Sequence, residues 1–249
     1  MTLHQNANKM KKIYSYLFSM LAMISLGSCS GDLASEGLTT VDDYPKIILN
    51  GEKFTISPIG QPYTDEGASA MFQNQDYSSK LVTTGISDID INKANLYYVT
   101  YSAIGPNGYK WSEKRTVAVC DPTITTNLEG TWVVQPASNR TDNNGETFTG
   151  CTVVVKKLCP GVFTISDYLA GYYQQYSYGP DYAAYNLSFS GIFSLTKDNK
   201  LEMITSDPAT SFSGSPTCTS FDGSYDPETK TMTYDAVGRG HTFHVVLKK

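Results

Sequence analysis

The feature that most constrains this fold is a side-chain pattern with a period of two, repeated in short stretches. Val117 and Val119 alternate with Thr116 and Ala118, and the same spacing recurs in many segments. Turn-forming residues separate these segments, as in the string IGPNG at residues 104–108. The sequence contains no long amphipathic helical pattern. It therefore predicts an all-β fold of short antiparallel strands, arranged as sandwiches or barrels.

Length determines how many domains these strands can build. The chain has 249 residues and a mass of 27.3 kDa, which suits two domains of about 100 residues each. One strand ends at Val119, and a new strand begins at Gly130 after the string DPTITTN at residues 121–127. We therefore predict a first domain over residues 44–121 and a second domain over residues 127–249.

The N-terminal segment has the features of a secretory signal. Three Lys and no acidic residue lie within residues 1–12, and a short apolar run follows over residues 13–26. This run is too short for a comfortable membrane span. Residues 26–29, LGSC, resemble the lipobox of bacterial lipoproteins, in which the Cys is acylated and becomes the first mature residue. An ordinary signal peptide that ends beside a Cys is the alternative.

The lipobox resemblance implies a signal peptide over residues 1–28, lipidation of Cys29, and a flexible tether over residues 29–43. Ser30 follows the Cys, whereas Asp at this position would resemble an inner-membrane retention signal. We therefore expect a lipid-anchored protein of the outer membrane that faces the periplasm or is exposed at the cell surface.

The charge of the chain excludes nucleic acid as a partner. The whole chain has a net charge of −5, and removal of the basic N-terminal segment makes the remainder more acidic. Nucleic acid binding needs clusters of Lys and Arg, which the sequence lacks.

Four Cys remain if Cys29 is lipidated, and their compartment permits disulfides. They are Cys120, Cys151, Cys159 and Cys218. A straight strand would hold Cys151 and Cys159 too far apart to pair directly. Other pairings stay open, and four free thiols are the alternative.

Patterns for catalysis or metal binding are scarce. His241 and His244 have an odd spacing within one strand, which places them on opposite faces and prevents a shared metal. No HExxH, GxSxG, Walker or CxxC motif occurs. Asp88, Asp90 and Asn92 alternate like calcium ligands but lack the Gly and distant Glu of an EF-hand, so turn formation explains them better. The 24 acidic residues could supply a glycosidase pair, but no pair stands out. We expect no metal, no cofactor and no enzymatic activity.

Four strings in the first half occur in a characteristic order: YTDEGA at residues 63–68, DIN at 90–92, YYVTYSA at 97–103 and RTVAV at 115–119. This series resembles the Ig-like domains of bacterial surface proteins and implies an Ig-like β-sandwich. Asn95 departs from that family, which has Gly there, but Asn also tolerates a positive φ.

The second half contains GVFTISDYLAGYY at residues 161–173 and FDGSYDP at 221–227. These strings resemble the C-terminal domain of two-domain lipoproteins of unknown function from gut Bacteroidetes. Such lipoproteins are often encoded near SusC/SusD-type glycan importers, so the resemblance implies these importers as partners.

About eight strands are expected in the second domain, over residues 130–135, 151–158, 162–166, 186–194, 200–205, 217–225, 231–236 and 241–248. Eight antiparallel strands can close into a lipocalin-like barrel or form a two-sheet sandwich, and we favour the barrel with one short helix.

Tyr is concentrated after the third of these strands. Seven of the 18 Tyr lie within eighteen residues, at positions 168, 172, 173, 176, 178, 182 and 185. A Tyr ring can stack on a sugar while its hydroxyl bonds a sugar hydroxyl. This interpretation predicts a ligand-binding site formed by Tyr172, Tyr173, Tyr176, Tyr178 and Tyr182.

Packing of a short helix explains the same residues. Leu169, Tyr172, Tyr173 and Tyr176 have the i, i+3, i+4, i+7 spacing of a helical stripe on the barrel end. Ser166 or Asp167 would cap this helix, which would end before Gly179.

These observations favour a non-catalytic, lipid-anchored outer-membrane protein that acts as an accessory glycan-binding protein. The first alternative is a structural or protein-interaction module of the surface with no small ligand. The second is a carboxylate-dependent glycoside hydrolase.

Overall fold

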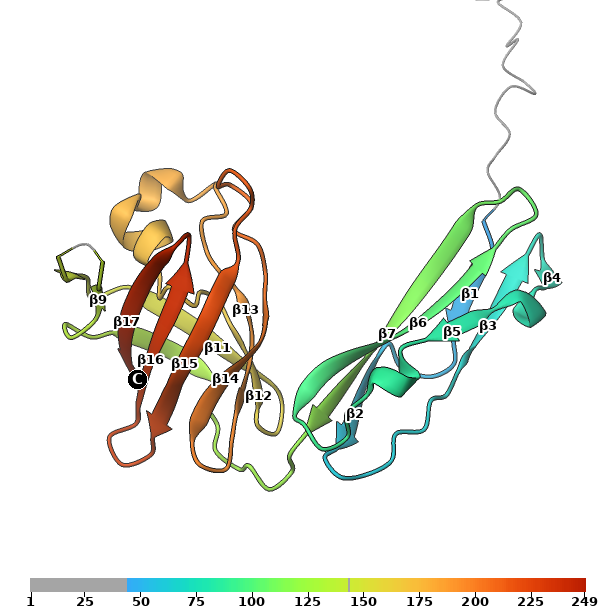
Figure 1. The fold of residues 1–249 in the computed structure, drawn as a ribbon, viewed down its shortest axis with the longest axis horizontal. Coiled ribbons are helices and arrows are strands. Elements are labelled where there is room, and N and C mark those ends of the chain that lie inside the picture. The colour runs from blue at the N-terminus through green and yellow to red at the C-terminus, as the bar shows by residue number, and fades with distance from the viewer. Residues whose placement is uncertain (1–43, 143) are drawn as a thin grey trace, which may run out of the picture. The chain divides into compact units, whose positions relative to one another are not determined.

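A computed structural model describes residues 44–142 and 144–249 (Figure 1). The expected signal peptide, Cys29 and tether lie outside the described residues. Strands dominate the described part, in which no helical segment exceeds six residues. The predicted all-β class is confirmed.

The first domain contains two small sheets whose buried side chains share one core. One sheet has the order β1-β3-β4 and the other the order β2-β7-β6-β5. β6 and β7 form a long hairpin, while β2 runs parallel to β7. The elements are β1 (Lys46–Leu49), β2 (Phe54–Pro58), β3 (Ala68–Phe72), β4 (Gln75–Asp76), η1 (Ser78–Lys80), β5 (Val82–Thr84), η2 (Ile86–Asp88), β6 (Asn95–Ile104) and β7 (Lys110–Cys120).

A buried ion pair lies in this core. The guanidinium of Arg115 is fully buried and contacts the carboxylate of Asp65. The hydroxyls of Tyr101 and Tyr63 donate to the same carboxylate at 2.6 and 2.9 Å, and the Gly67 N–H donates at 3.0 Å. The strings at 63–68 and 115–119 therefore supply the two charged partners of one network.

The second domain is a closed barrel of eight antiparallel strands, as predicted. The strand order is β8-β11-β12-β13-β14-β15-β16-β17, and β17 pairs with β8 through Leu247–Val134 and Lys248–Val133. The barrel strands are β8 (Gly130–Val134), β11 (Thr152–Cys159), β12 (Val162–Ile165), β13 (Gly191–Leu195), β14 (Lys200–Ser206), β15 (Cys218–Asp226), β16 (Thr231–Gly238) and β17 (His241–Lys248).

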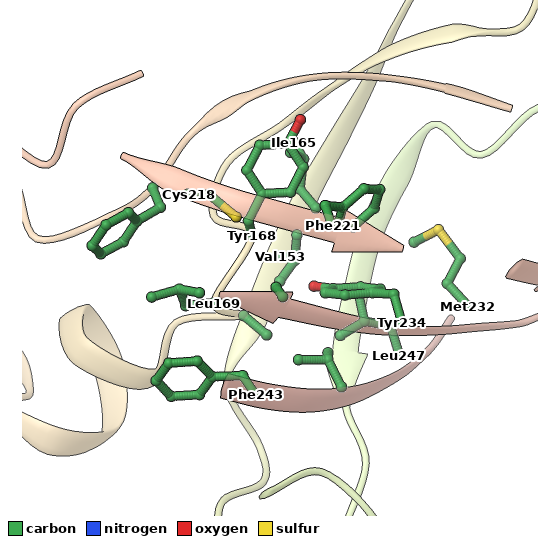
Figure 2. Close-up of a cluster of buried hydrophobic side chains, with 14 of the residues drawn as sticks. Val153, Ile165, Tyr168, Leu169, Cys218, Phe221, Met232, Tyr234, Phe243 and Leu247 are labelled. Atoms are coloured by element: carbon green, nitrogen blue, oxygen red, sulfur yellow. The ribbon is translucent and has the colours of Figure 1, made fainter. Parts of the chain in front are cut away.

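Aromatic and aliphatic side chains fill the barrel (Figure 2). The ring of Phe221 on β15 lies 4.7 Å from the ring of Tyr168 and 4.7 Å from the ring of Tyr234. Val153 on β11 and Leu247 on β17 are fully buried in the same cluster. The centre of the barrel is therefore a packed core.

The expected strands differ from the observed ones in two places. The strand expected over residues 186–194 begins only at Gly191, because the chain before it packs onto the barrel end instead of joining the ladder. The short strands β9 (Asn139–Arg140) and β10 (Glu146–Thr147) were not expected, and β9 pairs with β17. Two-residue strands carry too little periodicity to be detected.

One disulfide joins the two domains. Cys120 at the end of β7 is bonded to Cys159 at the end of β11, while Cys151 and Cys218 are buried free thiols. The alternative of four free thiols is wrong. Lys197 also forms an ion pair with Asp121 at 3.3 Å beside this junction.

Candidate functional site

The Tyr-rich segment, residues 167–189, lies between β12 and β13 at one end of the barrel (Figure 1). It contains the π-helix η3 (Tyr172–Ser177) and the 3-10 turn η4 (Pro180–Tyr182). We call this segment the cap.

Asp167 anchors both ends of the cap. Its side chain is 2% exposed and accepts three backbone N–H groups, from Leu169, Gly171 and Phe189, at 2.9–3.1 Å. Burial raises the pKa of Asp167 to about 6, although these three hydrogen bonds act in the opposite direction. The predicted helix cap at Ser166 or Asp167 is wrong, because η3 begins after Gly171 and has no side-chain hydrogen bond at its N-terminus. The Asp167 carboxylate instead joins the two ends of the cap.

Two adjacent Gln side chains hold the middle of the cap. Gln175 pairs with the backbone of Thr152, accepting its N–H at 2.8 Å and donating to its carbonyl at 2.7 Å, as a strand neighbour would. Gln174 donates to the Tyr182 carbonyl at 3.1 Å and accepts the Leu187 N–H at 3.0 Å. These contacts make the cap a positioned surface and not a loose loop.

Two of the five predicted site residues are buried on the inner side of the cap. Tyr172 and Tyr173 are 3% and 4% exposed, and their rings pack against those of Phe148, Phe212 and Phe243. The hydroxyl of Tyr172 donates to Glu146 at 2.7 Å. Tyr172 and Tyr173 therefore support the cap and do not present a surface to a ligand.

Three Tyr rings form an exposed row on the outside of the cap. The rings of Tyr178 and Tyr182 are 5.1 Å apart, and those of Tyr182 and Tyr185 are 5.6 Å apart. Their exposed fractions are 40%, 43% and 54% in chain order. We call these three residues the tyrosine row. Tyr185 was not among the predicted site residues, although its place in the Tyr-rich segment was a usable signal.

Tyr176 differs from the other predicted residues. It is exposed, but its ring contacts are with Tyr172 and Phe148, apart from the tyrosine row. The predicted helical stripe is therefore wrong at this position. Ala170 and Gly171 have positive φ values of 54° and 78°, which separate Leu169 from the helix. The i→i+5 bond from the Tyr176 N–H to the Gly171 carbonyl marks the wider π-helical turn.

An exposed cation lies beside the row. The guanidinium of Arg239, in the turn between β16 and β17, lies 4.1 Å from the ring centre of Phe212 and 5.0 Å from that of Tyr173. The ring of Phe212 is 6.2 Å from that of Tyr178. Arg239 therefore adds fixed hydrogen-bond donors at one end of an aromatic surface.

The two His lie on opposite faces of β17, as predicted. His244 contacts Asp235 at 2.7 Å, whereas His241 contacts Asp142 at 2.6 Å at the barrel mouth. The alternation along β17 buries Phe243, which lies between them in the chain. Within the described residues, no group of three His, Cys, Asp or Glu could hold a metal ion.

The suspected calcium ligands serve as turn residues. The Asp90 carboxylate accepts the Asn92 N–H at 2.9 Å, and the Asp90 carbonyl accepts the hydroxyl of Tyr97 at 3.1 Å.

A groove of about 460 Å³ lies elsewhere, on the outer wall over β11, β12 and β13. Its lining includes Lys156, Thr164, Ser190 and Asp207 but no aromatic ring. It offers no stacking surface, so the tyrosine row remains the candidate site.

The fold and the cap define a two-domain protein with an Ig-like sandwich followed by a closed antiparallel barrel. Residues 47–119 match the profile of a family described as bacterial surface protein, Ig-like domain. Residues 121–249, more than half of the chain, match a second family profile, which is described as a C-terminal domain. The chain belongs to the family of this C-terminal domain, which confirms the resemblance of both halves.

Two solved structures are similar to the chain. The lipoprotein BT2262 from Bacteroides thetaiotaomicron is 27% identical, with 83% of this chain and 100% of that chain covered and a TM-score of 0.43. A structure of CBM51-2 in complex with GlcNAc and INT domains, from Clostridium perfringens ZmpB, is 19% identical, covers 49% of this chain and 28% of that chain, and has a TM-score of 0.25. No curated protein matches the chain. Among residues 44–142 and 144–249, no helix has the length and apolar character needed to span a membrane.

Proposed function

We propose that this protein is a non-catalytic lipoprotein, anchored through Cys29 in the outer membrane, that binds glycans at the tyrosine row. The observation that carries the glycan part is the contact of three exposed rings on a segment fixed by Asp167, Gln174 and Gln175. Anchoring is supported by the lipobox-like string that ends at Cys29.

The tyrosine row has the chemistry that a carbohydrate needs. Sugar rings carry apolar C–H faces and equatorial hydroxyls, so they stack on aromatic faces while bonding polar groups at the edge. The exposed hydroxyls of Tyr178, Tyr182 and Tyr185 take part in no hydrogen bond among the described residues. Arg239 supplies further donors for sugar hydroxyls or for the carboxylate of an acidic sugar.

The row also has the rigidity that weak binding needs. Tyr178 packs against the buried Tyr173, and the Tyr182 carbonyl is held by Gln174. Ordering side chains on binding costs about 0.5–1.5 kcal/mol each, and a preordered platform avoids much of this cost.

A glycan array with the full chain, followed by calorimetry of Tyr182→Ala, tests the proposal. Loss of one stacking ring should weaken binding at least fivefold, which corresponds to about 1 kcal/mol, while the unfolding midpoint changes little. Tyr98→Ala is the matched control, because Tyr98 is 47% exposed on the Ig-like domain. Equal binding by the two variants would refute the site.

The anchor is tested separately by Cys29→Ala. Membrane fractionation should find the variant released from membranes or retained as an unprocessed precursor. Unchanged partition of the variant would contradict anchoring, whatever the glycan result.

The two alternative functions give different outcomes. A surface module without a small ligand binds no glycan on the array, yet retains a protein partner. A carboxylate-dependent hydrolase releases reducing sugar from a polysaccharide. If glycan binding is found, SusC/SusD-type importers are the partners that we propose.

A further inference from the structure

The Ig-like domain has an exposed aromatic cluster where the described chain begins. The ring of Tyr44 lies 5.5 Å from the ring of Tyr109 and 5.6 Å from the ring of Trp111. All three side chains are nevertheless 43–46% exposed. Large aromatic rings that contact one another and still face water form a surface suited to a partner. We call these three residues the aromatic tip.

A shallow groove of about 290 Å³ lies at the same end of the β6–β7 hairpin as the aromatic tip. Its lining consists of Lys80, Val82, Ser102, Ala103, Ile104 and Lys110. Ile104 and Val82 are 57% and 56% exposed. Ile104 pairs with Lys110, and Ala103 pairs with Trp111, so the groove and the tip lie on opposite faces of the β6–β7 hairpin at the same end of it.

The groove is positively charged, although the chain as a whole is acidic. Its lining contains two Lys and no acidic residue, whereas the whole chain has a net charge of −5. Exposed Tyr and Trp rings beside Lys are the combination that occurs at membrane–water interfaces. Aromatic rings lie at the level of the lipid headgroups, and Lys contacts the phosphates.

We propose that this end of the Ig-like domain docks onto the surface of a lipid bilayer. The aromatic tip enters the headgroup region, and Lys80 and Lys110 face lipid phosphates. The inference rests on the lipid anchor proposed above, but not on glycan binding.

The position of the tip along the chain favours a bilayer over a protein partner. Tyr44 follows Cys29 by fifteen residues. Fifteen residues reach at most about 50 Å even when fully extended, so the tip stays within that distance of the membrane that holds the proposed anchor. At such a high effective concentration even a weak contact is populated.

Trp fluorescence provides a direct test, because the chain has only two Trp. Trp111 is in the tip, whereas Trp132 is 1% exposed in the barrel core. The full acylated chain is reconstituted into vesicles of phosphatidylcholine with 30 mol% phosphatidylglycerol, with or without lipids brominated near the glycerol. Bromine quenches on contact, so Trp111 emission should fall at least twofold. Trp111→Phe, which leaves only the Trp132 signal, should show no quenching.

A relocated Trp supplies the matched control. Tyr98 lies six residues before Ile104 on β6, about 20 Å down the strand, and is similarly exposed. In Tyr98→Trp/Trp111→Phe, bromolipids should not quench the new Trp. Lys80→Glu/Lys110→Glu should reduce the quenching of Trp111.

Three outcomes would overturn the proposal. The first is a chain that floats with the vesicles but whose Trp111 is not quenched, which would leave the anchor intact. In the second, bromolipids do not quench Trp111, but its protection from aqueous acrylamide increases with protein concentration. This result would indicate that a second copy of the chain is the partner. The third is a chain that does not float, which would remove the anchor and the docking together.

Discussion

Asp65 and Arg115 form a buried ion pair although fifty residues separate them in the chain. The side chain of Arg115 is fully buried and that of Asp65 is 9% exposed. The guanidinium also donates to the backbone carbonyls of Glu52, Asn50 and Gly67. One side chain therefore connects the chain before β2, the start of β3 and the middle of β7.

The first prediction concerns this pair. Asp65→Ala leaves the Arg115 charge buried without its partner and should lower the free energy of unfolding of the Ig-like domain by about 3–5 kcal/mol. Urea unfolding followed through Trp111 emission measures this loss of stability. The emission of a Trp111→Phe protein is subtracted to remove the contribution of Trp132. Lys53→Ala, which breaks the exposed pair of Lys53 with Glu113, should cost about 1 kcal/mol or less. Similar costs for the two variants would contradict the buried-pair argument.

The pH dependence of the Ig-like domain follows from the same carboxylate. Burial by itself raises the pKa of Asp65, but hydrogen bonds from Tyr101, Tyr63 and Arg115 outweigh it and hold the pKa below the ordinary value. A lowered pKa in the folded state stabilises the protein above the unfolded pKa of about 4, and this stability is lost as the pH falls. Between pH 5 and pH 2, the destabilisation caused by Asp65→Ala should therefore shrink.

Asp167 should show the opposite pH dependence. Its pKa is raised from 3.8 to about 6 in the folded state, so the folded barrel binds a proton more tightly than the unfolded chain. The contribution of Asp167 to stability is therefore complete below about pH 4 and falls by about 2–3 kcal/mol as the pH rises through 6. The destabilisation by Asp167→Asn should be largest near pH 4 and smaller at pH 7. Unfolding of the barrel, followed through Trp132 in a Trp111→Phe background, measures the destabilisation at pH 4 and at pH 7. A destabilisation that does not change with pH would count against a raised pKa.

The barrel core contains a Tyr whose hydroxyl has no partner among the described residues. Tyr234 is 2% exposed, and its oxygen makes no hydrogen bond there. Tyr234→Phe removes a buried unsatisfied group and should leave the barrel equally stable or more stable by about 1 kcal/mol. Tyr168→Phe is the control, because the Tyr168 hydroxyl donates to the carbonyls of Ile192 and Thr205 at 2.7 and 3.0 Å. Its loss should cost about 1 kcal/mol or more. Thermal unfolding measures the midpoint of both variants. A lower midpoint for Tyr234→Phe than for Tyr168→Phe would contradict this prediction.

Peptide mapping without reduction should find one crosslink, between the peptides that contain Cys120 and Cys159. Cys151 and Cys218 are buried, and burial raises the pKa of both thiols, that of Cys218 to about 11. Because the thiolate is the reactive form, both should resist iodoacetamide in the folded protein and react after unfolding. Rapid labelling of either thiol under native conditions would contradict this arrangement.

Much of the fold could be predicted because its causes are local. The alternation around Val117 and Val119 continues along β7, and turn residues such as those at 226–229 mark where β15 and β16 meet. The partnership of Asp65 with Arg115 was not predicted, although both residues lie in the strings that identified the Ig-like domain. The sequence motifs identify the domain, but the contact between two of their residues is visible only in the folded structure.

The cap was harder to predict. The concentration of Tyr in one segment was visible, but burial of Tyr172 and exposure of Tyr182 depend on left-handed residues and a π-helix that disturb the α-helical period. The pairing of Gln175 with Thr152 likewise depends on tertiary approach. The disulfide between Cys120 and Cys159 could not be assigned from the sequence for the same reason.

The two residue pairs that join β17 to β8 have a consequence for how the barrel forms. Leu247 and Val134 are more than a hundred residues apart, so their contact is among the least local in the domain. Closing so long a loop is entropically costly and slow, which places ring closure late in folding. While this seam is open, β8 and β17 present unpaired edges beside an incompletely covered interior, so we expect aggregation to start from such open forms. The pairing of β17 with β8 closes the native barrel, and we expect the chain to be most prone to aggregation before this pairing forms.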